Sequence, residues 1–230
     1  MHDTFNKVDH GSTGRRATLL LLAGSLLCQP LSAHVIVGEL EKMSAGSAAL
    51  LYLQLGYRHI LPLGLDHILF VLSLFLLSPR LPAVLWQATA FTIAHSVTLG
   101  LAMYHLITPP VRLVESLIAL SILYVALENI FSPRLKKTRV GVVFLFGLVH
   151  GMGFAGALGQ LGLPPNAYLL SLVMFNIGVE LGQMTIIIAA FFLLGKWFGG
   201  KSWYRQRVVI PLSGIIAATA AFWLVQRLFF

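Results

Sequence analysis

Residues 167–195 read AYLLSLVMFNIGVELGQMTIIIAAFFLLG, an apolar run in which Glu180 is the single charged residue. A helix needs about 20 predominantly apolar residues to cross the hydrocarbon core of a bilayer. The run therefore predicts a transmembrane helix. The whole chain agrees, because 57% of its 230 residues are hydrophobic and only 10% are charged. That composition excludes a soluble globular domain and a disordered chain.

Further apolar runs lie on both sides of this one, so we expect an all-α membrane protein with six transmembrane helices. The predicted spans are 61–78, 84–107, 112–131, 140–160, 167–195 and 208–229. Lys and Arg collect in the connections 79–83, 132–139 and 196–207. The positive-inside rule places these connections in the cytoplasm and the N-terminus outside. The net charge of +8 therefore belongs to loops and does not indicate nucleic-acid binding.

The first 33 residues resemble a cleaved secretory signal peptide. Arg15 and Arg16 precede a short apolar run, and the small residue Ala33 stands at the expected cleavage site. An uncleaved anchor is the alternative. Cleavage would remove Cys28, the only cysteine, and leave His34 at the new N-terminus. The predicted organisation in the inner (cytoplasmic) membrane is a signal peptide at 1–33, an outer-face segment at 34–59 and a six-span domain at 60–230.

The outer-face segment predicts one short amphipathic helix that lies on the membrane, from a Ser44 cap to a Gly56 end. After it, Pro62 removes a backbone donor and Gly64 frees the backbone. One expectation is a helix broken at membrane depth, a feature that often lines ion sites. The other is a plain interfacial helix start, in which Asp66 caps the helix that follows.

Acidic residues and histidines lie inside the predicted spans, while no Lys or Arg lies near a span centre. An ionised carboxylate in hydrocarbon is expensive unless it is paired, protonated or hydrated, so these residues are candidate ligands for a metal ion. Together with His59 near the outer surface, they are Asp66, His67, His95, Glu115, Glu128, His150 and Glu180.

Most candidates also have a structural explanation. His95 and His150 could be core histidines that hydrogen-bond across helices. Glu115 could pair with Arg112, and Glu128 with the basic connection that follows it.

Glu180 is the strongest single candidate, because Asn176, Glu180 and Gln183 form one polar stripe at helical spacing. The candidates also follow one another in depth. Asp66 and His67 lie nearest the outer end, and Glu128 lies nearest the inner end. Such a ladder of nitrogen and oxygen ligands suits a path for a divalent transition metal, with nickel or cobalt ranked before zinc and copper. The alternatives are an intramembrane zinc-dependent hydrolase and a non-transporting, metal-binding accessory protein.

Several short blocks of this sequence resemble the second branch of the HupE/UreJ membrane family. In chain order they are His59 with Asp66-His67, FTIAHS at 91–96, VES at 114–116 with Glu128-Asn129, FGLVHG at 146–151 and FNIGVE at 175–180. The resemblance implies a six-span protein associated with hydrogenase or urease maturation and regarded as a nickel or cobalt permease. It also implies an entry motif at His59, Asp66 and His67. The expected partners are the metal ion, the lipid bilayer and a metalloenzyme maturation machinery, without nucleic acid and without a firmly bound cofactor.

Overall fold

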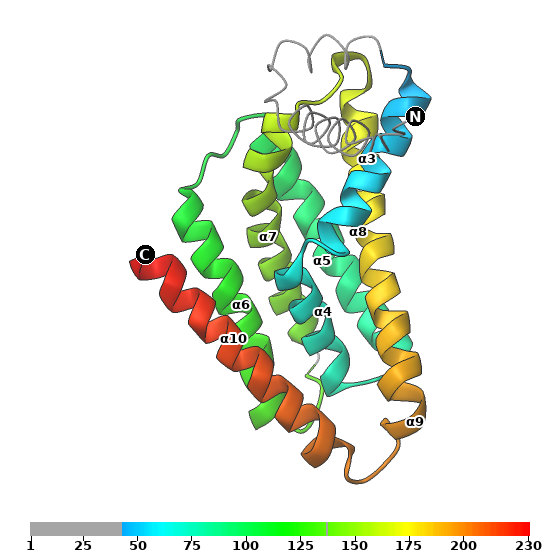
Figure 1. Cartoon of the computed structure of the whole chain (residues 1–230), viewed down its shortest axis with the longest axis vertical. Coiled ribbons are helices and arrows are strands. Elements are labelled where there is room, and N and C mark those ends of the chain that lie inside the picture. The colour runs from blue at the N-terminus through cyan, green and yellow to red at the C-terminus, as the bar shows by residue number, and fades with distance from the viewer. Residues whose placement is uncertain (1–42, 137) are drawn as a thin grey trace, which may run out of the picture. The chain divides into compact units, whose positions relative to one another are not determined.

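The computed structural model describes residues 43–136 and 138–230, and these residues form helices and connections without a strand. The predicted signal peptide at 1–33 lies outside the described residues. The main helices are α3 (Ala45–Ile60), α4 (Leu65–Leu77), α5 (Leu81–Met103), α6 (Val111–Phe131), α7 (Arg139–Leu161), α8 (Tyr168–Ala190) and α10 (Ile210–Phe229) (Figure 1). The π-helical turn Phe191–Gly195 continues α8 into the short α9 (Lys196–Phe198), and a second one, Arg205–Val209, precedes α10.

Five helical segments are long and apolar enough to cross a membrane, and there are six if the bent pair of α3 and α4 is one span. The prediction of an all-helical membrane protein is therefore confirmed. The observed helix ends differ from the predicted spans by only a few residues.

From α4 onward, consecutive long helices run in opposite directions (Figure 1). The connections 78–80, 132–138 and 199–204 therefore lie at one end of the bundle, which we call the basic end because Lys and Arg collect there. The connections 104–110 and 162–167 lie at the other end, the opposite end. This arrangement places the Lys and Arg residues of the connections at one end of the bundle, as the sequence predicted.

The chain breaks between α3 and α4, which are bent by 69°. The Leu61 N–H still donates to the carbonyl of Tyr57 at 2.8 Å, but Pro62 has no N–H with which to continue the helix. Gly64 lies so close to the carbonyl of His59 that a Cβ atom would overlap it. The expectation of a broken helix is confirmed, and the interfacial helix start is not what forms.

Helix α3 packs along α8 (Figure 1). Ser44 caps it as predicted, accepting from the N–H of Ser47 at 3.2 Å. The predicted end at Gly56 is wrong, because the helix continues to Ile60. Gly56 instead lets the helices approach, since a Cβ there would overlap the Phe175 backbone. One face of α3 is thus buried in the bundle instead of resting on a surface.

Two further helix pairs complete the bundle, α5 with α7 and α6 with α10. On α7, Gly147 and Gly151 lie against the α5 backbone, where a Cβ would overlap the carbonyls of Phe91 and His95. These contacts hold α7, which carries His150, against α5, which carries His95. The spacing of Gly147 and Gly151 therefore determines how closely α7 approaches α5 at the candidate site.

Candidate metal centre

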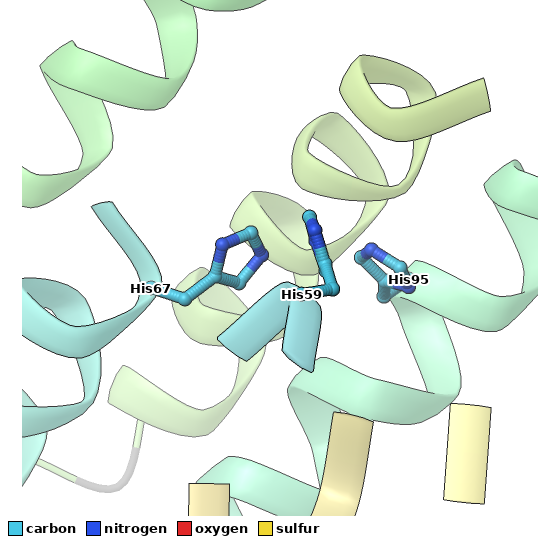
Figure 2. Close-up of side chains that lie close together, drawn as sticks. All are labelled: His59, His67 and His95. Carbon is cyan, nitrogen blue, oxygen red and sulfur yellow. The ribbon is translucent and has the colours of Figure 1, made fainter. Parts of the chain in front are cut away.

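Three histidines meet where α3 breaks from α4. His59 lies in the last turn of α3, His67 in the first turn of α4 and His95 in the middle of α5. One ring nitrogen from each lies within 4.8 Å of the other two. Figure 2 shows the three rings side by side, with centroids 4.7 Å apart for His59 and His67 and 6.3 Å apart for His59 and His95. The break therefore carries two members of the cluster, one on each side.

Neighbouring side chains select the tautomers of two of these rings. Nδ1 of His67 lies 3.1 Å from Oδ1 of Asp66, and Nδ1 of His95 lies 3.2 Å from Oδ1 of Asn176. The amide of Asn176 is oriented by its NH₂ group, which donates to the Leu172 carbonyl at 2.9 Å. Each Nδ1 thus carries the proton and donates it, which leaves the Nε2 lone pair free. Metal-binding histidines are commonly oriented in this way.

His150 faces His67 from α7. Its Nδ1 lies 3.4 Å from Nε2 of His67, and its Nε2 lies 3.0 Å from Oγ of Ser121. The Ser121 hydroxyl also lies 2.7 Å from the Ile118 carbonyl, to which it donates. One proton or one cation can bridge Nδ1 of His150 and Nε2 of His67, since both nitrogens are buried and 3.4 Å apart. Imidazole nitrogens bound to one tetrahedral ion at 2.0–2.1 Å are ~3.3 Å apart, so a cation fits this gap.

Two other ring nitrogens are also free. Nε2 of His59 and Nε2 of His95 are buried without a hydrogen-bond partner in the described part of the chain. The cluster of His59, His67 and His95 therefore offers free ring nitrogens around one site, and His150 lies beside His67 at its edge. Imidazole and carboxylate donors without thiolate suit nickel, cobalt, zinc or Cu(II).

A cavity of about 190 Å³ adjoins the histidines between α4, α6, α7 and α10. Its polar lining consists of His59, Asp66, His67, Glu115, His150 and Arg227. The expected ion pair of Glu115 with Arg112 is wrong: the described residues form only two ion pairs, and Glu115 is in neither. Glu115 instead lies on the wall of the cavity.

Phenylalanines close the other side of the site. Phe70, Phe91 and Phe146, which we call the aromatic layer, lie about one turn from His67, His95 and His150 towards the basic end. The Phe91 ring centroid is 5.0 Å from that of Phe70 and 4.9 Å from that of His150. The aromatic layer separates the site from the basic end.

Beyond the aromatic layer lies a buried arginine. Arg139 is 2% exposed, and both of its terminal nitrogens lie 3.1 Å from Oδ1 of Asn129. One of them is 3.2 Å from Oε2 of Glu128. Glu128 therefore forms the structural ion pair that the sequence left open and stands apart from the histidines. The sequence reasoning missed Arg139 because it counted this residue with the connection; its place directly before an apolar run was the available signal.

Glu180 also stands apart from the histidines. Its Oε1 accepts from the Thr89 hydroxyl at 2.7 Å, and Gln183 accepts from Thr92 at 3.2 Å. With the contact between Asn176 and His95, these bonds show that the polar stripe of α8 faces α5. Glu180 lines a groove of about 660 Å³ between the two helices.

The structure thus gathers His59, Asp66, His67, His95 and His150 at one level, with Glu115 on the adjoining cavity wall. The sequence had placed Asp66 and His67 nearer the outer end than His95 and His150, which it placed near mid-membrane. The difference arises because α3 precedes α4 within the bundle, so that the break lies deeper than the sequence suggested.

A family model described as "HupE / UreJ protein" matches residues 37–227. The match covers every helix described above except the last two residues of α10, and it covers every candidate site residue. No curated protein and no solved structure matches the chain.

Proposed function

We propose that this chain, which belongs to the HupE/UreJ family, is a membrane permease for a divalent transition-metal ion, with nickel or cobalt as the preferred cargo. The observation that carries the proposal is the buried cluster of His59, His67 and His95, in which one ring nitrogen from each lies within 4.8 Å of the other two. Nδ1 of His150 lies 3.4 Å from Nε2 of His67, at the edge of this cluster. His59 and His95 each supply a free nitrogen at the same place.

Ligand and supporting roles follow from the hydrogen bonds. His59, His67, His95 and His150 bind the ion. Asp66 and Asn176 orient two of these rings through Nδ1, and Ser121 orients the third through Nε2. Because Asp66 is ionised beside a cationic centre, it also lowers the cost of bringing a dication into the membrane.

Access to the site is asymmetric. The polar cavity with Glu115 supplies the way in, and the aromatic layer with Arg139 blocks the way to the basic end. Passage of the ion therefore requires the aromatic layer to move, and the bend between α3 and α4 is a place where such movement can begin. We expect the basic end to face the cytoplasm, so that the ion enters from outside.

The closed aromatic layer also favours a second candidate function, a membrane accessory protein that binds the metal without transporting it. The metalloenzyme maturation machinery is the expected recipient of the metal in either case.

The test is nickel binding and uptake of radioactive nickel by the full chain in proteoliposomes. His67→Ala and His150→Ala should abolish both. His105→Asn is the matched control: His105 is exposed in the connection after α5 and has φ 57°, which asparagine tolerates. Binding without uptake would favour the accessory protein. Absence of binding by the unmodified chain would refute the proposal.

A further inference from the structure

The cavity beside the histidines contains one fixed positive charge, Arg227, in the last turn of α10. Among the described residues that line this cavity, it is the only Lys or Arg. Its Nη1 donates to the backbone carbonyl of Glu115 on α6 at 2.9 Å. Its guanidinium also lies over the Trp223 ring, 5.6 Å from the centroid. Arg227 is therefore held at the cavity wall from two sides.

This position is unfavourable for a site that only has to bind a cation. Asp66 and Glu115 attract a dication into the cavity, while Arg227 repels it. The guanidinium is held by the Glu115 backbone carbonyl and forms no ion pair with either carboxylate in the described residues, so its charge acts on any ion that enters the cavity.

We propose that Arg227 is a specificity-determining residue that weakens metal binding electrostatically and thereby speeds metal release. This inference rests on the proposed function. A buried cluster of imidazoles forms a strong site, and an ion that must pass through cannot be held too tightly. Arg227 supplies the opposing charge, and it acts on the ion in proportion to the charge of that ion.

Helix packing alone offers a different explanation for the same arginine. A cation in the last turn of a helix stabilises that helix, and the bond to Glu115 ties α10 to α6. A packing defect would disturb the geometry of the site for every ion. The two explanations therefore differ in how the effect depends on ionic charge.

The experiment measures the Kd of Ni²⁺ and of Ag⁺, which also binds imidazole, for the full chain in detergent. Arg227→Gln should tighten Ni²⁺ binding about tenfold, and Ag⁺ binding by only the square root of that factor, about threefold. The nickel off-rate should fall. Arg227→Lys keeps the charge and should leave both constants within about twofold of the parent chain. Arg112→Gln, which removes an exposed arginine outside the cavity, should also leave them unchanged.

Unchanged or weaker Ni²⁺ binding in Arg227→Gln would overturn the inference. Equal changes for both ions, or the same change in Arg227→Lys, would assign Arg227 to packing. Failure of the parent chain to bind Ni²⁺ would instead refute the proposed function, so the two failures are distinguishable.

Discussion

Nε2 of His67 and Nδ1 of His150 lie 3.4 Å apart, while the other nitrogen of each ring contacts Asp66 or Ser121. The two residues come from α4 and α7, which the chain separates by two other helices. Their meeting depends on Gly147 and Gly151, which hold α7 against α5. The metal centre is therefore a product of helix packing.

Replacing Asp66 with Asn keeps the shape of the side chain but removes its charge. His67 loses the partner that orients it and raises its basicity, so nickel affinity should fall about 10- to 100-fold. Glu180→Gln is the contrast, because Glu180 contacts Thr89 and no histidine. Its nickel Kd should stay within about twofold. Isothermal titration in detergent measures both, and equal losses would place Glu180 in the site after all.

Nickel binding should weaken as the pH falls. An imidazole binds a metal only when its ligand nitrogen is deprotonated, and the ordinary pKa of histidine is about 6.5. Burial disfavours the charged imidazolium, so protonation competes with the metal only below this ordinary value. The check is the nickel Kd measured from acidic to neutral pH. Nickel binding that strengthens as the pH falls would contradict imidazole ligands.

Gly151→Ala should destabilise the protein and the site together. The new methyl group would overlap the His95 carbonyl and the Thr98 hydroxyl, so α7 must shift away from α5. Such overpacking costs about 1–3 kcal/mol. The control is Gly156→Ala on the same helix, where a Cβ meets nothing within 4 Å. Thermal unfolding in detergent should show a lower Tm for Gly151→Ala only, with weaker nickel binding.

Arg139→Met should lower stability strongly. It leaves Glu128 without its ion-pair partner and Asn129 Oδ1 without a donor, and breaking a buried pair costs about 3–5 kcal/mol. Combining it with Glu128→Gln should recover part of the loss, because the uncompensated charge is gone. Arg134→Met, an exposed position in the same connection, should have no effect on Tm. A stable Arg139→Met variant would contradict the structural role given to this residue.

Membrane orientation can be read from single cysteines introduced at Lys136, Lys201 and Pro165. The first two lie at the basic end and the third at the opposite end. A membrane-impermeant thiol reagent added to intact cells should label only the cysteine at Pro165. Labelling of the other two instead would reverse the proposed direction of transport.

The sequence was sufficient for the helices and for most of the residues in the centre. Apolar runs gave the spans, and the cost of polar groups in hydrocarbon selected His67, His95 and His150. The residues alone placed His59 near the outer surface, and only the family resemblance grouped it with Asp66 and His67. Its role depends on α3 packing into the bundle through Gly56, which looked like a helix end.

The same limit of a single sequence explains why Glu180 is the strongest candidate by its pattern but lies apart from the histidines. Periodicity correctly placed Asn176, Glu180 and Gln183 on one face, and that face does turn towards α5. Which residue of the stripe meets a histidine depends on the register between two helices, and a single sequence does not contain that register. Asn176 meets His95, while Glu180 meets Thr89.

The break between α3 and α4 gives the metal a mechanical role. His59 and His67 lie on its two sides, joined by a short loop whose closure costs little entropy. An ion bound by both rings would hold the two half-helices at a fixed angle to each other. Metal binding would then restrict the motion of α3 and α4 along their whole length as well as that of the ligands. Amide hydrogen exchange at 61–64 would slow when the ion is bound.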